Sequence, residues 1–319
     1  LFSTVSPEYQ QRLLKNRLEN RGYFHASVKK NENTNDQKIA LDFTVKTGRA
    51  FRIDSISYSV GNSLLTREIQ SLQTNSFLKS EEVFDLDVIK AERERISAHM
   101  KERGFYFFSA NDILVLADTT DSPYEVDFVV TLKRKLQTFA DRQFSIGDIY
   151  IYSDPEYKSD TASHKQAYVY HDLQIIDPNQ RYKPSIFRQA LSIESGSIYK
   201  RTNHNKSLNR LIDLRIFKYV DNRFEVANDS TLDVVYYLTP NKKRTARFEL
   251  TGRSTSTNFA GAEINLNWRN RNLFNGAENL SLSLYAGMDV QIYGINKGNN
   301  LYRVGANADF TFPRFITPF

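Results

Sequence analysis

Cysteine is absent from this chain of 319 residues, so it has no disulfide, no thiolate metal site and no cysteine nucleophile. No apolar run approaches the length of about 18 residues that a membrane helix requires. The mean hydropathy of −0.52 agrees with that absence. A transmembrane helix is therefore excluded, but membrane strands are not, because about half of their side chains are polar.

A large excess of one charge is also missing. Lys and Arg number 43 against 37 Asp and Glu, which gives a net charge of +6 and a pI near 9.2. The basic residues form no block of about five or more, and no aromatic residues are interleaved with them in a nucleic-acid motif. We therefore predict a solvated basic surface and no nucleic acid partner.

Recognisable catalytic motifs are missing as well. The chain has no Gly-x-Ser-x-Gly elbow, no phosphate-binding Gly-Lys-Ser/Thr loop and no histidine pair spaced for zinc. His164 and His171 share a Tyr-rich segment with Asp160 and Asp172, which we interpret as a solvated loop rather than a metal site. The carboxylates at 81–87 precede a helix, where negative charge is stabilising. We predict that the chain is not an enzyme and binds no metal or cofactor.

Beyond about residue 240, apolar and polar residues alternate one by one through four segments. Because successive side chains of a strand point to opposite faces, each segment would have one apolar and one polar face. Repeated alternating segments of about 10 residues are the sequence signature of a transmembrane β-barrel. We predict that residues 242–319 form the first four or so antiparallel strands of such a barrel. The alternating segments are 244–251, 262–269, 280–289 and 302–312.

An internal repeat precedes these segments. The pattern Phe-x-Ile-x-x-Ile at 51–56 recurs 93 residues later at 144–149. In both copies the alternation slips by one residue between the second and third apolar positions, which predicts a β-bulge. Helix-like and strand-like segments follow each copy, so the repeated unit is βααββ and the fold class is α+β. We predict a partial unit at 1–48, a complete unit at 50–134, and a third at 142–240 with an insertion at about 154–182.

Glycines mark the ends of two predicted helices. Gly22 and Gly104 can each adopt the left-handed conformation that closes a helix, and an aromatic residue then begins a strand. In the third copy Arg215 or Ile216 takes the place of the glycine, so we predict a different helix end there. The strands after the helices are predicted at 24–30, 39–46, 105–116, 124–133, 218–227 and 231–238.

Tandem βααββ units in front of alternating strands resemble the polypeptide-transport-associated (POTRA) repeats and barrel of the BamA/TamA superfamily of outer-membrane assembly proteins. Residues 272–278, Asn-Leu-Phe-Asn-Gly-Ala-Glu, are similar to a turn found early in those barrels, and residues 312–315 are similar to the exit of a following strand. The Tyr-rich insertion is most similar to the TamA-like lipoproteins of Bacteroidetes. We interpret Arg103-Gly104-Phe105 as a helix end and not as the Arg-Gly-Phe/Tyr barrel-loop motif of the family.

The resemblance implies a place in the outer membrane, with residues 1–240 in the periplasm. No signal peptide precedes the first helix, so we expect an exported protein in mature or trimmed form. Four strands cannot close a barrel, and open strand edges are not tolerated in hydrocarbon. We therefore expect residues 242–319 to be the beginning of a longer barrel. The partners that the resemblance implies are unfolded outer-membrane proteins, TamB-like or accessory envelope proteins, and outer-membrane lipid.

Free edges of the small sheets are the predicted binding sites, because an exposed strand edge can pair with another extended chain. The resemblance implies that the first barrel strand, 244–253, forms one side of a seam that admits incoming strands. An ordinary closed barrel wall remains an alternative. So do a scaffold that docks a periplasm-spanning partner for protein or lipid transport, and a barrel fused to a hydrolase upstream of Leu1. The candidate partner-binding residues are Phe105, Phe107, Leu114, Lys218, Val220 and Phe224. The candidate seam residues are Thr245, Arg247, Phe248, Glu249, Leu250 and Thr251.

Overall fold

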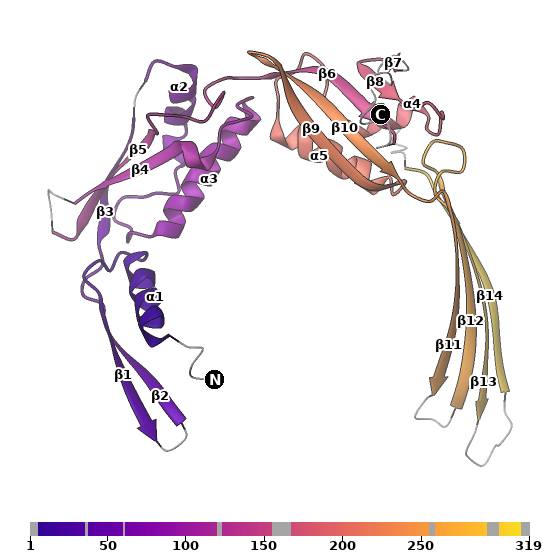
Figure 1. Cartoon of the computed structure of the whole chain (residues 1–319), viewed down its shortest axis with the longest axis horizontal. Coiled ribbons are helices and arrows are strands. Elements are labelled where there is room, and N and C mark those ends of the chain that lie inside the picture. The colour runs from indigo at the N-terminus through magenta and orange to yellow at the C-terminus, as the bar shows by residue number, and fades with distance from the viewer. Residues whose placement is uncertain are drawn as a thin grey trace. The chain divides into compact units, whose positions relative to one another are not determined.

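The computed structural model describes residues 6–35, 38–59, 61–119, 123–154, 167–254, 259–291 and 300–313. The chain divides into two compact units, whose elements Figure 1 labels. The first unit contains Leu1–Phe144 with Tyr199–Arg201, and the second contains Ser145–Ile198 with Thr202–Phe319. Within the described ranges, none of the helices has the length and apolar character needed to cross a membrane.

The first unit begins with one helix and a two-stranded sheet. Helix α1 (Pro7–Glu19) starts at Ser6, whose side chain accepts a hydrogen bond from the Tyr9 N–H. Strands β1 (Ser27–Asn35) and β2 (Lys38–Lys46) pair antiparallel in an uninterrupted register. This part of the chain therefore has the last helix and the last two strands of the predicted βααββ order.

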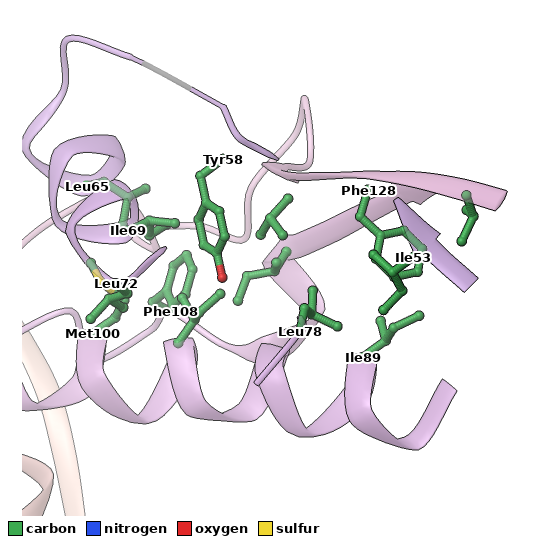
Figure 2. Close-up of a cluster of buried hydrophobic side chains, with 14 of the residues drawn as sticks. Ile53, Tyr58, Leu65, Ile69, Leu72, Leu78, Ile89, Met100, Phe108 and Phe128 are labelled. Atoms are coloured by element: carbon green, nitrogen blue, oxygen red, sulfur yellow. The ribbon is translucent and has the colours of Figure 1, made fainter. Parts of the chain in front are cut away.

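The rest of the first unit has the complete order. A three-stranded sheet β3-β5-β4 combines a parallel pair, β3 with β5, and an antiparallel pair, β4 with β5. The elements are β3 (Arg52–Tyr58), α2 (Leu64–Ser71), η2 (Gln73–Asn75), α3 (Leu86–Glu102), η3 (Ala110–Asp112), β4 (Ile113–Asp118) and β5 (Glu125–Leu132). Apolar side chains from both α-helices and the sheet meet in one core, which Figure 2 shows around Leu65, Met100 and Phe128.

The predicted strand 105–116 is wrong over its first eight residues, because β4 begins only at Ile113. Phe105 and Phe108 are buried in the core, and the chain between them is turned rather than extended. Ser109 and Asp112 then form a capping box that starts the short helix η3. Burial of these rings and the capping box override the strand tendency of the aromatic residues.

The second unit contains a five-stranded mixed sheet, in the order β7-β8-β6-β10-β9. Strand β10 runs parallel to β6 and antiparallel to β9. Helix α5 packs on β9, where the His204 ring lies 4.8 Å from the Phe224 ring. The elements are β6 (Ser145–Tyr152), β7 (Tyr168–Tyr170), β8 (Leu173–Ile176), α4 (Pro184–Ala190), α5 (Arg201–Asp213), β9 (Phe217–Asn228) and β10 (Thr231–Pro240).

The insertion at about 154–182 is not only a solvated loop. Strand β8 pairs parallel with β6, and β7 pairs with β8, so the insertion extends the sheet. Leu173, Ile175 and Ile176 are fully buried. Of the residues considered for a metal site, His171 lies in the turn between the two strands, and Asp172 pairs with Arg188. His164 and Asp160 lie outside the described residues.

The second unit ends in a four-stranded antiparallel sheet. Its strands are β11 (Arg244–Ser254), β12 (Phe259–Asn270), β13 (Asn279–Gln291) and β14 (Asn300–Thr311), and they pair in chain order. No register shift interrupts any of the three pairings. Within the described ranges, β11 and β14 each have one edge without a strand partner.

The predicted β-bulges are confirmed in both repeats. The register shifts between Ile53 and Ile56 where β3 pairs with β5, and at the equivalent position where β6 pairs with β10. In each bulge an aspartate of the neighbouring strand accepts the backbone N–H that the irregularity leaves without a ladder partner. The Ser55 N–H lies 3.1 Å from Asp127 Oδ1, and the Asp148 N–H lies 2.9 Å from Asp233 Oδ1.

We expect Asp127→Ala to destabilise the β3–β5 pair by about 1 kcal/mol, because the Ser55 N–H and hydroxyl both lose their acceptor. Hydrogen exchange of the β3 and β5 amides measures the local free energy of opening. Asp127→Asn, which keeps a carbonyl acceptor, is the matched control and is expected to cost less. Equal effects of the two substitutions would show that the acceptor is unimportant.

The helix-ending glycines also connect one repeat to the next. Gly22 has φ +85° and Gly104 has φ +92°, which confirms the predicted left-handed conformation. The Gly22 carbonyl accepts the Phe51 N–H at 2.9 Å, and the Gly104 carbonyl accepts the Phe144 N–H at 2.9 Å. A Cβ at Gly22 would lie 3.0 Å from the Phe84 carbonyl oxygen, so a side chain there meets both strain and crowding.

The predicted different end for the third long helix is wrong. Arg215 follows α5 with φ +58°, so it adopts the same left-handed conformation without being a glycine. The next residue, Ile216, accepts the Asn241 N–H at 2.8 Å. The left-handed conformation costs a non-glycine residue about 1–2 kcal/mol. Glycine avoids this strain, but it loses more chain entropy on folding, which offsets part of the gain.

We therefore expect Arg215→Gly to stabilise the end of α5 by about 0.5–1 kcal/mol, and Gly22→Ala to destabilise α1 by at least about 1 kcal/mol. Hydrogen exchange at the last turn of each helix would report the two opposite signs. A loss of protection in Arg215→Gly would contradict this account of the helix end.

Candidate functional site

Four of the six candidate partner-binding residues lie on edge strands. Strand β4 ends the order β3-β5-β4, and β9 ends the order β7-β8-β6-β10-β9. Leu114 lies on β4 and is partly exposed. Lys218, Val220 and Phe224 lie on β9, which is 12 residues long and directs the backbone groups of alternate residues to its open side. Within the described parts of the chain, no strand pairs with this side of β9.

Phe105 and Phe107 do not lie on an edge strand. Phe105 is 1% exposed and belongs to the core in front of β4. The Phe107 ring lies 5.4 Å from the ring of Phe144 and 5.7 Å from that of Phe139. Both side chains therefore serve packing, and only the backbone of β4 itself remains as an edge in this repeat.

The side chains of β9 alternate between two environments. Val220 and Phe224 are partly buried, and Phe224 faces the His204 ring of α5. The residues that alternate with this partly buried set are exposed and mostly charged, and sequence reasoning did not single them out. Their signal was the polar alternation along this strand. They are Tyr219, Asp221, Arg223 and Glu225.

The turn 272–278 between β12 and β13 attaches the four-stranded sheet to the repeat that precedes it. The Asn272 Nδ2 donates to the Arg181 carbonyl at 2.8 Å, and the Lys183 N–H donates to the Asn275 carbonyl at 2.7 Å. Asn275 and Ala277 both have positive φ, which gives the turn its tight shape. The sequence identified this turn by resemblance, but it gave no sign of its contact with residues 181–183.

A buried carboxylate holds the turn together. Glu278 is 3% exposed and accepts the N–H groups of Phe274 and Gly276 at 3.1 and 2.9 Å. Burial opposes ionisation, but these backbone donors prevail and hold the pKa of Glu278 below its usual value. The carboxylate therefore remains charged and fixes the turn at neutral pH.

The four-stranded sheet has one polar and one apolar face. In the middle of the sheet, residues directly opposite one another across the four strands share the same polarity. A polar row is Arg247, Asn267, Ser283 and Asn307, and an apolar row is Leu250, Ile264, Ala286 and Val304. Phe248, Leu250 and Val304 are 66%, 67% and 82% exposed, so the apolar face is bare.

The candidate seam residues all lie on β11, and they divide between these faces. Phe248 and Leu250 lie on the apolar face. The remaining four lie on the polar face, and they are Thr245, Arg247, Glu249 and Thr251. The side chains along the open edge of β11 therefore project from both faces of the sheet.

A cluster of charged side chains crosses the polar face near one end of the sheet. Asp289 of β13 accepts from Arg253 of β11 at 3.2 Å and from Arg303 of β14 at 2.9 Å. Glu263 of β12 lies 3.6 Å from Arg253. These pairs link all four strands on one face and require a polar environment there. In the part of the chain that the structure covers, no three His, Asp or Glu side chains are arranged to hold a metal ion.

Comparison with known proteins identifies the class of the first repeat. Residues 1–48 match the family model described as POTRA, surface antigen variable number repeat. This match confirms the predicted resemblance to POTRA repeats over that segment. No curated protein sequence matches the chain.

Several solved structures are similar to this chain at low sequence identity. A crystal structure of POTRA3-5 of Haemophilus influenzae BamA shares 19% identity and covers 73% of this chain and 79% of that chain, with a TM-score of 0.43. A crystal structure of BamA from Haemophilus ducreyi without POTRA domains 1-3 shares 12% identity and covers 82% of this chain and 47% of that chain, with a TM-score of 0.44. The structure of CdiB from Escherichia coli shares 12% identity and covers 94% of this chain and 46% of that chain, with a TM-score of 0.33. The chain spans about half the length of these last two.

Proposed function

We propose that this chain belongs to an outer-membrane protein that assembles or translocates other outer-membrane proteins. In this proposal residues up to about 240 lie in the periplasm, and strands β11 to β14 begin a membrane barrel. The observation that carries the proposal is the bare apolar face of these strands, with a charged face behind it. The POTRA match of residues 1–48 supports the periplasmic assignment.

The size of the apolar face favours lipid as its surroundings. Its rows extend from Leu280 to Met288 on β13, about 27 Å along the strand, and four strands are about 19 Å wide. A bare surface of about 500 Å² lies in the upper part of the range of about 300–600 Å² that the largest apolar patch of a soluble monomer covers, and such patches often mark contact surfaces. After strand tilt, its height is comparable with the apolar band of about 25 Å found on membrane barrels.

A membrane position also places a requirement on the two open edges. Backbone N–H and C=O groups cannot remain unpaired in hydrocarbon, so β11 and β14 must each meet a further strand. In the proposed protein these partners complete the barrel, and the contact at β11 is the seam. The narrower resemblance to TamA-like lipoproteins of Bacteroidetes stays a prediction.

The proposed role of β9 is to bind extended polypeptide by strand addition. Its 12 residues offer a long open edge, and the charged residues on one of its faces discourage pairing with another copy. Unfolded barrel segments have the alternating pattern that a strand addition site accepts. In this role the chain binds and guides substrates and is not an enzyme.

A crosslinking experiment tests this role, and the absence of cysteine makes each introduced cysteine unique. Arg223→Cys places a thiol on β9, and Val169→Cys places one on β7, the opposite edge of the same sheet. We expect an unfolded outer-membrane protein segment with a single cysteine to crosslink several-fold more at Arg223→Cys. Equal crosslinking at the two edges would remove the basis for substrate binding at β9.

A second candidate function is a scaffold for one periplasm-spanning partner of the TamB-like type. The regular part of β9 favours it, because its register on β10 is uninterrupted from Tyr219 to Val226 and a continuous edge suits one stable strand pairing. A photocrosslinking side chain at position 223 in the native envelope separates the two functions. Many substrate proteins in the adducts support assembly, whereas one constant partner supports the scaffold.

A further inference from the structure

The second unit contains a cavity of about 440 Å³ where β10 leads into β11 and the turn 272–278 meets the preceding repeat. Three cationic side chains line it, and amide side chains surround them. Among the described residues, no carboxylate is part of the lining. The lining residues that matter are Arg181, Lys243, Arg271, Asn241, Asn272 and Asn275.

Two of the three cations have neutral hydrogen-bond partners. Lys243 Nζ donates to Asn275 Oδ1 at 3.2 Å. Arg271 Nη1 donates to the Lys242 carbonyl at 3.1 Å and to Thr245 Oγ1 at 3.2 Å. Arg181 differs, because it pairs with Asp154 at 3.2 Å. The cavity therefore has more positive charge than its own ion pairs neutralise.

The buried carboxylates described in the same unit are engaged elsewhere. Glu278 accepts backbone N–H groups within its own turn, and Asp177 accepts from the Ser153 hydroxyl and the Tyr182 N–H. Burial and the neighbouring Arg269 lower the pKa of the Arg271 guanidinium below its usual value. An anion in the cavity would reverse both effects, because it would replace lost hydration and offset the repulsion.

We propose that this cavity binds a phosphate group, either on an anionic phospholipid headgroup or as free phosphate. Guanidinium and ammonium groups are the side chains that bind phosphate, and the surrounding amides can hydrogen-bond its ester or glycerol oxygens. The phosphate chemistry stands on the cavity alone. The lipid source rests on the proposed function, which places the ends of β11 and β12 at the periplasmic membrane surface.

The test uses the full chain in an uncharged detergent with three probes. These are inorganic phosphate, a short-chain phosphatidylglycerol, and phosphatidylcholine of the same chain length. Lys243→Gln and Arg271→Gln each remove one lining charge. Lys242→Gln, which removes an equal charge beside the cavity, is the matched control. Titration calorimetry gives the dissociation constants, and circular dichroism checks that each variant is folded.

We expect each cavity variant to raise the dissociation constant for the bound phosphate probe about tenfold, in keeping with one lost charge-assisted hydrogen bond. The control is expected to change it less than about twofold. Tighter binding of phosphatidylglycerol than of phosphate identifies a lipid site, and the reverse order identifies a free phosphate site. Phosphate and phosphatidylglycerol that bind all three variants like the unaltered chain would overturn the proposal.

This outcome is distinguishable from a failure of the proposed function, because soluble probes do not require the sheet to lie in a membrane. If the chain binds phosphate but β13 does not contact lipid, the proposed membrane role is wrong and the proposed phosphate site still holds. Membrane contact with no phosphate binding would remove the cavity site only. Lys243→Gln remains informative if Arg271→Gln does not fold, because Lys243 is exposed and its ammonium hydrogen-bonds the side-chain amide of Asn275.

Discussion

Ile264→Lys should abolish or severely reduce membrane insertion, whereas Asn265→Lys, one residue further along β12, should leave it nearly unchanged. Ile264 lies in the middle of the apolar face, and Asn265 lies on the polar face. A lysine that faces lipid near the bilayer centre costs about 2–4 kcal/mol, a factor of about 30 to 1,000 in the insertion equilibrium. The fraction of full-length protein that resists alkaline or urea extraction from membranes measures the effect.

The same pair of substitutions distinguishes lipid from water around this face. If the apolar face were exposed to water, Ile264→Lys would improve solubility and cost little stability, because a lysine is well hydrated there. If another protein layer covered it, Leu284→Lys on the next strand would impair folding even in detergent. Equal extraction of Ile264→Lys and Asn265→Lys would therefore argue against a membrane-facing surface.

Glu92→Ala should lower the stability of the complete repeat in the first unit by about 3 kcal/mol. Glu92 is fully buried on α3, where Arg95 Nη2 donates to its Oε1 at 2.6 Å. The Phe77 N–H donates to its Oε2 at 2.9 Å, and the Tyr58 hydroxyl also donates to it. Removal of the carboxylate takes an acceptor from the Phe77 N–H, and it leaves Arg95 with the Leu72 carbonyl and the Tyr58 hydroxyl with Ser76 Oγ.

The matched control is Glu94→Ala, which removes an exposed carboxylate from the same helix and is expected to change stability by less than about 0.5 kcal/mol. Urea unfolding, with hydrogen exchange at α3 as the probe, measures the change in stability that each of the two substitutions causes. A Glu92→Ala effect as small as that of Glu94→Ala would show that the buried group contributes no net stability.

The same carboxylate predicts how stability depends on pH. Burial opposes its ionisation, but Arg95, the Phe77 N–H and Tyr58 together hold the pKa of Glu92 below its usual 4.5. Its contribution is therefore present above pH 4.5 and is lost as the pH falls through the lower folded pKa. Burial and Glu92 also raise the pKa of Tyr58 to about 12, so Tyr58 stays a donor throughout this range. Glu92→Gln should remove this part of the acid dependence.

The sequence allowed the local features of the fold to be predicted, because their causes lie within a few residues. The alternation at 280–289 follows the strand period of two, and the structure shows the corresponding two faces. The bulge at 53–56 was visible as a slip in the same period. Gly22 and Gly104 marked helix ends because glycine tolerates the left-handed conformation.

Features that depend on distant contacts could not be predicted. Asn272 meets the Arg181 carbonyl across 91 positions in the chain, and no local pattern announces that contact. Arg215 adopts a glycine-like conformation that its residue type does not indicate. The strands β7 and β8 are short, and their place beside β6 depends on tertiary packing of the buried Leu173 and Ile175.

Single cysteines along β13 test whether the apolar face of strands β11 to β14 contacts lipid. Leu282, Ser283, Leu284 and Tyr285 are changed to cysteine one at a time in the full-length protein in its native envelope, and each is treated with a charged maleimide. If this face contacts lipid, we expect labelling at 283 and 285, protection at 282 and 284, and labelling of all four after denaturation. Labelling at 282 and 284 equal to that at 283 and 285 would contradict it.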